Sequence, residues 1–170
     1  MQAGMLLQRW SIHITHRIPR DSGMPSVFDK LNLKGHDEIL VVNAPPSFEP
    51  ELRSLDGVTV LRDPKRAKQV RFALAFATRQ AEVDSLAGTL CAKAEGDALL
   101  WFAYPKGTSK KYTCEFNRDT GWDALRNAGF DTVRQVAIDA DWSALRFRRV
   151  EYIKRQANSV DVSSPRHAPG

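Results

Sequence analysis

At 170 residues the chain is long enough to bury a hydrophobic core without disulfides or structural metals, and its 42% hydrophobic and 26% charged residues exclude a disordered or fibrous protein. No run approaches the roughly 18 apolar residues of a membrane span. The cysteines, Cys91 and Cys114, lie in unrelated contexts, which predicts free thiols in a reducing, cytoplasmic compartment. The net charge of +5 is mild and favours an ordinary solvated surface over a dedicated polyanion-binding one.

Both ends of the chain are predicted to lie outside the folded domain. Residues 1–24 carry three arginines and two histidines without a sustained apolar period, which predicts a disordered extension, and translation is expected to start at Met1 or Met24. Residues 158–170 are small, polar and proline-bearing, which predicts a disordered tail. A single α/β domain is therefore expected over residues 25–157.

The first half of the domain alternates short helices with apolar strands. Ser26 and Asp29 have the spacing of a capping box and predict a short helix. A buried strand is expected at 38–43, followed by a helix that Ser47 could cap and by a short strand at 58–61. The simplest account of this stretch is a strand–helix–strand unit.

The second half continues this alternation and closes with a hairpin. A strand at 70–77 is expected to lead into a helix that Thr78 caps and Gly96 ends, because apolar residues recur between them at helical spacing. The remaining expected elements are a strand at 99–104, a helix capped by Asn117 or Asp119 and ending at Gly129, and two strands at 132–139 and 142–150, separated by Ala140 and Asp141.

Helices that alternate with apolar strands are typical of a three-layer α/β sandwich. We therefore expect a Rossmann-like fold with a mainly parallel sheet and a C-terminal antiparallel hairpin. This fold also predicts where a ligand would bind, because open α/β sheets bind ligands in the crevice beyond the carboxyl ends of their strands.

The basic loop that follows the strand at 99–104 is the best candidate for a ligand site. It lacks the second glycine and the helix entry of a Walker phosphate loop, so a solvated basic loop is the competing interpretation. We expect a small anionic ligand or a protein partner to bind in the crevice formed by this loop and the turn after the strand at 38–43, without a cofactor, and we favour binding over catalysis. The candidate ligand-binding residues are Asn43, Lys106, Thr108, Ser109 and Lys110.

Other titratable residues form no recognisable catalytic or metal-binding set. His13 and His16 have a metal-ligand spacing but no third ligand nearby, so no metal site is expected. Cys114 could be a nucleophile only with a base that the spacing does not reveal. Asp139 and Asp141 are expected to serve the final turn.

Nucleic-acid binding at the hairpin is a third interpretation. Arginines gather there beside aromatic side chains, the combination that binds phosphates and stacks on bases. Because Trp142 begins a strand, we expect it to pack in the core, and we rank this function below ligand or partner binding. The residues concerned are Arg134, Arg146, Arg148, Arg149, Trp142 and Tyr152.

From the strand at 99–104 onward, the order of elements is similar to that of class I methyltransferases, which also finish with a strand, a helix ending near a glycine and an antiparallel hairpin. The resemblance implies a transferase-like enzyme as the alternative function. The turn after the first strand reads Asn43-Ala44-Pro45-Pro46, however, and lacks the glycines that let backbone approach the cofactor. The alternative is thus a transferase with a degenerate cofactor motif, and S-adenosylmethionine is not expected to bind.

Two further segments resemble an uncharacterised bacterial family, a domain of unknown function. They are the aromatic-Pro-Lys loop at 104–109 (YPKGTS) and the closing strand at 139–148 (DADWSALRFR), in which Asp141 stands where the family often has threonine. The resemblance spans about residues 28–154. It implies a bacterial, cytoplasmic protein and supplies no reaction.

Overall fold

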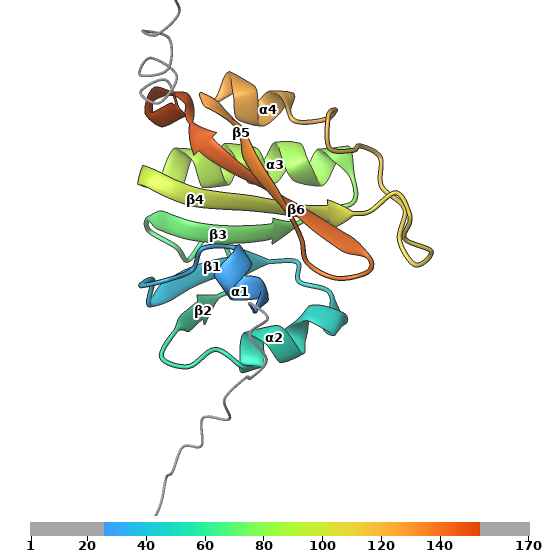
Figure 1. Ribbon diagram of the computed structural model, residues 1–170. Helices are drawn as coiled ribbons and strands as arrows, with labels where there is room; N and C mark the ends of the chain where they lie inside the picture. Colours follow the sequence, from blue (N-terminus) through green and yellow to red (C-terminus); the bar gives the residue numbers. More distant parts are fainter. Residues whose placement is uncertain (1–25, 154–170) are drawn as a thin grey trace, which may run out of the picture.

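The computed structural model describes residues 26–153 (Figure 1). The predicted N-terminal extension and C-terminal tail lie outside the described residues and stay predictions. The elements are α1 (Val27–Lys30), β1 (Glu38–Val42), the 3-10 helix η2 (Pro46–Phe48), α2 (Glu49–Arg53), β2 (Thr59–Leu61), β3 (Val70–Phe76), α3 (Gln80–Lys93), β4 (Ala94–Pro105), α4 (Asp123–Asn127), β5 (Phe130–Ala137) and β6 (Trp142–Arg149).

The strands form one sheet in the order β2-β1-β3-β4-β6-β5. β2, β1, β3 and β4 are parallel to one another, whereas β6 is antiparallel to both β4 and β5. η2 and α2 follow β1 and α3 follows β3, so the connections of these two neighbouring strands are helical (Figure 1). The predicted mainly parallel sheet with a C-terminal antiparallel hairpin is confirmed.

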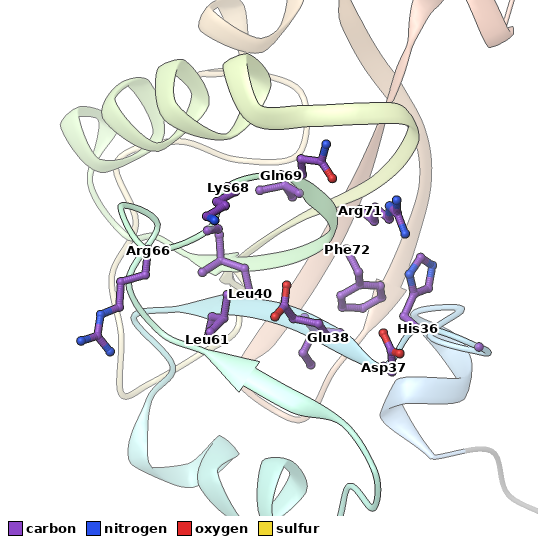
Figure 2. A pocket seen from close by; sticks show the side chains of 14 residues that line it. His36, Asp37, Glu38, Leu40, Leu61, Arg66, Lys68, Gln69, Arg71 and Phe72 are labelled. Atoms are coloured by element: carbon purple, nitrogen blue, oxygen red, sulfur yellow. The ribbon is translucent and has the colours of Figure 1, made fainter.

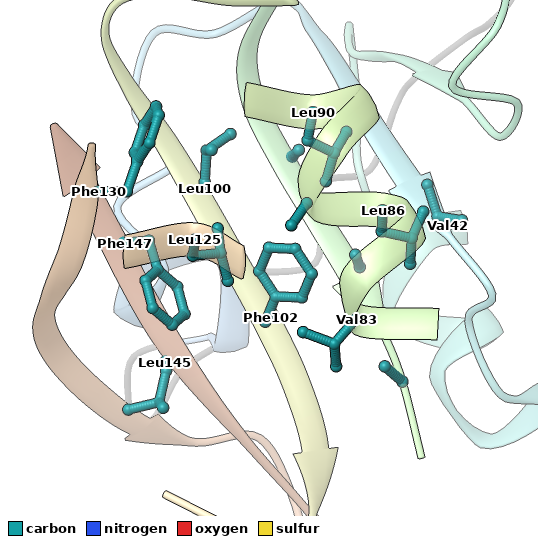
Figure 3. Close-up of a cluster of buried hydrophobic side chains, with 14 of the residues drawn as sticks. Val42, Val83, Leu86, Leu90, Leu100, Phe102, Leu125, Phe130, Leu145 and Phe147 are labelled. Carbon is teal, nitrogen blue, oxygen red and sulfur yellow. The ribbon is translucent and has the colours of Figure 1, made fainter. Parts of the chain in front are cut away.

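Helices cover both faces of the sheet. On one face, Leu90 of α3 and Leu125 of α4 pack around Phe102 of β4 in a buried cluster (Figure 3). On the opposite face, Phe28 of α1 and Phe48 of η2 belong to a second buried cluster. Strands buried on both faces read as continuous apolar runs, which is why the central strands could be predicted. The three-layer arrangement is confirmed.

Of the caps predicted for the first two helical segments, the cap of α1 is confirmed and the cap of the next segment is wrong. Ser26 forms the predicted capping box, since the Asp29 amide donates to Ser26 Oγ at 3.1 Å and the Ser26 amide donates to Asp29 Oδ2 at 3.0 Å. The prediction for Ser47 was wrong, because this residue lies inside η2, which starts at Pro46 without a side-chain cap. Proline has no amide hydrogen to satisfy, so this helix start needs no capping side chain there.

The predicted cap of α3 was also wrong. The helix begins at Gln80, and the carboxylate of Glu82 accepts the backbone N–H groups of Thr78 and Arg79 at 2.9 and 3.0 Å. A carboxylate in the first turn therefore satisfies the helix entrance in place of the Thr78 hydroxyl.

α3 ends earlier than predicted, because a strand replaces its last expected turn. The helix ends at Lys93 and the chain passes directly into β4, where Ala94 pairs with Val70 of β3. Gly96, expected to end the helix, lies inside β4 with φ of 60°. β4 is therefore longer than the apolar run that predicted it.

The caps proposed for α4 were wrong, because the helix starts later. Asn117 Oδ1 accepts the amides of Asp119 and Thr120 at 2.7 and 3.0 Å, which makes a side-chain turn in the loop. α4 begins at Asp123, with Trp122 at its N-cap position and fully buried.

The hairpin connection is longer than the two residues expected. β5 ends at Ala137 and β6 begins at Trp142, whose carbonyl accepts the amides of Ile138 and Asp139 at 2.9 and 3.3 Å. The predicted turn role of Asp139 is confirmed, because its Oδ1 accepts the amides of Asp141 and Trp142 at 2.8 and 2.9 Å.

The crossover from β2 to β3 contains no helix. Residues 62–69 carry the chain past β1 as a loop, and Ala67 of this loop is 3% exposed. Lys93 Nζ of α3 donates to the Pro64 carbonyl at 2.6 Å and holds the loop in place. Parallel strands are usually joined by a longer, helical crossover, so this side of the sheet is less thickly covered.

Gly121 fixes the long loop between β4 and α4 against α3. Its φ is 95°, and a Cβ there would lie 2.5 Å from Phe116 Cβ and 2.7 Å from Gln80 Oε1. The Gln80 amide Nε2 also donates to the Gly121 carbonyl at 2.8 Å. A side chain at this position would have to displace the contact between loop and helix.

We expect Gly121→Ala to lower the free energy of unfolding by about 2–4 kcal/mol, because left-handed backbone costs an L-residue about 1–2 kcal/mol and the overlap with Phe116 adds to it. Denaturant unfolding measures the loss. Gly129→Ala is the matched control, since Gly129 has φ of 91° and nothing within 4 Å of an added Cβ. Equal losses in the two variants would contradict the close contact.

Cys91 of α3 gives the domain a pH-dependent stability. Burial against the hydrophobic cluster that surrounds Phe102 raises the pKa of its thiol from 9.0 to about 11. Because the folded state holds the proton more tightly than the unfolded state, the stabilisation is complete below about pH 9 and is lost as the pH rises toward 11.

We expect the free energy of unfolding of the unmodified chain to fall by about 1–2 kcal/mol more between pH 9 and pH 11 than that of Cys91→Ala. The variant loses packing at every pH, but it has no thiol to ionise. Denaturant unfolding over this pH range measures the difference. Parallel pH profiles for the two proteins would contradict the assignment.

Candidate functional site

A cavity of about 740 Å³ lies at the carboxyl end of β4, under the loop of residues 106–118. Tyr104 and Pro105 at the end of β4 form one wall, and the loop forms another. Gln135 of β5 and Ser143 of β6 close it from the hairpin side. We call this the β4-loop cavity, and it occupies the edge of the sheet at which open α/β folds bind ligands.

The structure brings together part of the predicted set of ligand-binding residues. Lys106, Thr108 and Ser109 line the β4-loop cavity, whereas Lys110 and Asn43 do not. Asn43 follows β1, and β3 lies between β1 and β4 in the sheet, so the two loops do not enclose one crevice. Ligand binding by these three lining residues stays a prediction.

Ser109 already has hydrogen-bond partners that hold the loop in place. Its Oγ donates to Asp141 Oδ1 at 2.9 Å and accepts the amides of Lys111 and Tyr112, both at 3.2 Å. The Lys106 amide donates to the Asp141 carbonyl at 2.8 Å, so the start of the loop is tied to the hairpin turn as well. These bonds give the cavity a fixed wall.

The far end of the loop is tied to the start of α3. The Glu115 amide donates to the Thr78 carbonyl at 3.0 Å, and Glu115 Oε1 accepts the Gln80 amide at 2.8 Å. The carboxylate of Glu115 is thus bound to backbone at the helix entrance. The loop is fastened to the hairpin at one end and to α3 at the other.

Three polar side chains of the cavity were missed by the sequence analysis. The Gln135 amide Nε2 donates to the Tyr104 hydroxyl at 3.0 Å, and burial raises the pKa of Tyr104, which keeps that hydroxyl protonated. Arg118 also lines the cavity, and its guanidinium is paired with Asp119 at 3.2 Å. No local signal marks Gln135, because the hairpin meets β4 only in the tertiary structure.

Cys114 also lines the cavity, but its thiol is not activated. Burial raises the pKa of Cys114, the opposite of the shift that a thiolate nucleophile needs. The thiol is therefore protonated near neutral pH. Cys114 contributes a small, partly buried surface to the cavity.

The crevice between β1 and β3 is the topological switch point of the sheet, because α2 and α3 follow these strands on opposite faces. Asn43, with φ of 59°, reaches across it and donates from Nδ2 to the Phe76 carbonyl at 3.5 Å. Phe48 is 1% exposed and packs on the Phe76 ring, with ring centroids 5.1 Å apart. Side chains of this chain therefore bridge the crevice.

A second cavity, of about 430 Å³, lies at the amino ends of β1 and β3, beside the helix-free crossover (Figure 2). Leu40 and Leu61 are among its apolar lining residues, and the charged Glu38, Arg66 and Lys68 line it as well. The three charged residues are exposed and of mixed sign. This edge is opposite to the one at which open α/β sheets bind ligands, so the β4-loop cavity is the better candidate.

The described part of the chain, residues 26–153, contains neither a candidate metal site nor a helix that could cross a membrane. Within this range, no three His, Cys, Asp or Glu side chains gather in a way that could hold a metal ion. His13 and His16 lie outside it. No helix in the same part of the chain has the length and apolar character needed to cross a membrane.

Neither a protein-family model nor a curated protein matches the chain in sequence. Solved structures match it in shape. A SAM-dependent methyltransferase from Aquifex aeolicus is 14% identical, with a TM-score of 0.52 over 72% of this chain and 87% of that chain. The pyocyanin biosynthetic protein PhzM is 11% identical, with a TM-score of 0.51 over 72% and 53% of the two chains. Magnesium protoporphyrin IX methyltransferase from Synechocystis is 11% identical, with a TM-score of 0.49 over 72% and 81%.

At these identities the likeness shows the fold alone. The six-stranded mixed sheet with its antiparallel last hairpin agrees with the match to the Aquifex aeolicus protein. The resemblance to an uncharacterised bacterial family stays a prediction. The chain has the Rossmann-like α/β fold found in SAM-dependent methyltransferases.

Proposed function

We propose that this chain is a transferase-like protein related to class I methyltransferases, that its cofactor crevice is degenerate, and that it binds a small anionic ligand in the β4-loop cavity. The observation that carries the proposal is this cavity of about 740 Å³ at the carboxyl end of β4, with Lys106 and Arg118 among its lining residues. The fold comparison supports a relationship to methyltransferases better than it supports the alternative of an α/β domain that has no such relatives.

The residues at the switch point do not fit S-adenosylmethionine. The turn after β1 has no glycine, and the Asn43 amide bridges to the Phe76 carbonyl where a ligand would approach. Arg62, directly after β2, binds both oxygens of Glu49 at 2.8 and 2.9 Å.

The β4-loop cavity offers a better match to a small anion. Its volume lies within the range of about 300–1,000 Å³ that is usual for ligand pockets. Lys106 and Arg118 supply positive charge. Arg118 Nε donates to Asp119 Oδ1 at 3.2 Å, and its Nη groups remain to bind a carboxylate or phosphate. Tyr104 and Gln135 supply neutral donors at the opposite wall. A carboxylate or phosphate on a compact organic ligand would use both kinds of group.

We expect thermal-shift screening against phosphates, nucleotides and acidic metabolites to find a ligand that stabilises the full chain. Lys106→Ala and Arg118→Gln should each weaken its binding by about tenfold or more, because each removes a charge-assisted hydrogen bond. Lys111→Ala is the matched control, since Lys111 is an exposed lysine of the same loop that does not line the cavity. Equal weakening in all three variants would contradict the cavity as the site.

Methyl transfer is the second candidate function, and the fold comparison favours it. Calorimetric titration of the full chain with S-adenosylmethionine distinguishes methyl transfer from a protein with a degenerate cofactor crevice. We expect no saturable binding, because the residues of the switch point do not fit the cofactor. Saturable binding would contradict a degenerate cofactor crevice and favour methyl transfer.

A further inference from the structure

The face of the β5–β6 hairpin away from α3 and α4 carries a cluster of arginines. Trp142 and Ala144 of β6 belong to the buried cluster on this face, so Arg146 and Arg148, which continue the alternation, point to the same side. Arg134 of β5 stands directly opposite Arg146. β6 is antiparallel to β4 and therefore ends near the amino end of β4 (Figure 1).

The arginines outnumber the acidic groups beside them. Asp97 of β4 accepts two hydrogen bonds from Arg148, at 2.9 and 2.7 Å, and its Oδ1 lies 4.0 Å from an Arg146 nitrogen. Arg134 is exposed and has no ion pair within the described residues. Arg146 and Arg148 thus share one carboxylate while Arg134 pairs with none among the described residues, and like charges placed directly opposite each other across a strand pair are destabilising.

Arg146 is the least satisfied member of the cluster. Its side chain is only 18% exposed, and its Nε is buried without a hydrogen-bond partner among the described residues. Burial lowers the pKa of Arg146, Asp97 opposes this shift, and Arg148 and Arg134 add to it. An unpaired N–H and uncompensated positive charge are both costly in a half-buried place.

We propose that Arg134, Arg146 and Arg148 form a phosphate-binding site on this open face of the hairpin. A phosphate group placed between Arg134 and Arg146 would accept hydrogen bonds from the guanidinium Nη groups and offset the excess charge, because guanidinium forks match phosphate geometry. Arg148, held by Asp97, forms the border of the site. The site is separate from the β4-loop cavity, since Gln135 of that cavity alternates with Arg134 and points to the other face.

The phosphate could come from a small phosphate ester or from a nucleic-acid backbone. Trp142 is 3% exposed and packs edge-on against Phe76, so it offers no surface for stacking a base. The aromatic side chain beside the cluster is Tyr152, whose ring centroid lies 5.8 Å from Arg148 Cζ, and the arginines themselves recognise charge and phosphate geometry. Both sources share the chemistry that the arginines recognise, and the two arms of one experiment distinguish them.

In the first arm, thermal unfolding of the full chain is followed in inorganic phosphate and in sodium chloride of equal ionic strength. We expect phosphate to raise the melting temperature further, and Arg134→Gln and Arg146→Met each to weaken phosphate binding by about tenfold or more. Arg134 is exposed, so its variant keeps the fold even where Arg146→Met does not. Arg66→Gln, which removes an exposed arginine of the 62–69 loop, should bind phosphate like the unmodified chain.

In the second arm, fluorescence anisotropy follows a labelled single-stranded oligonucleotide at several salt concentrations. Binding that falls steeply with salt and is lost in Arg134→Gln would identify a nucleic-acid backbone as the source. Phosphate binding without oligonucleotide binding would identify a small phosphate ester. Phosphate that stabilises Arg134→Gln as much as the unmodified chain, or stabilises neither beyond chloride, would overturn the proposal.

Discussion

β4 is the strand on which the rest of the structure depends, because it is buried on both faces and hydrogen-bonded on both edges. It pairs in parallel with β3 and antiparallel with β6, and so joins the two halves of the sheet. On one face, Trp101 is fully buried and its Nε1 donates to the Leu31 carbonyl at 2.9 Å, which ties the N-terminal helix to the sheet. On the other, Phe102 packs edge-on against Trp122 and Phe147. The β4-loop cavity opens where this strand ends.

The sequence predicts the central strands well, since burial on both faces leaves a continuous apolar run. It predicts helix ends poorly, because Glu82 satisfies the entrance of α3 and Gly96 sits within a strand. In the site, Lys106 could be predicted because it directly follows β4. Gln135 reaches the cavity only through hairpin pairing, and the misplacement of Asn43 came from the unseen position of β3 between β1 and β4.

The fold and the candidate sites give different information about function. A Rossmann-like sheet supports many unrelated activities, so the fold alone names no reaction. At the switch point, Asn43 and the Glu49–Arg62 ion pair occupy the space next to β1 and β2. The cationic residues of the two candidate sites lie elsewhere. Lys106 stands at the end of β4, and Arg146 stands on the open face of the hairpin. Function is therefore best sought away from the crevice that gives this fold its usual role.

The helix-free crossover also shapes the motions of the domain. β2 has three residues, none of them buried, and pairs only with β1, while the crossover that follows it is a loop. Regions with few buried apolar contacts open at the lowest free energy. The amides of β2 should therefore exchange with solvent long before those of β3 and β4. Opening of this edge would leave the two candidate binding sites, at the other side of the sheet, folded.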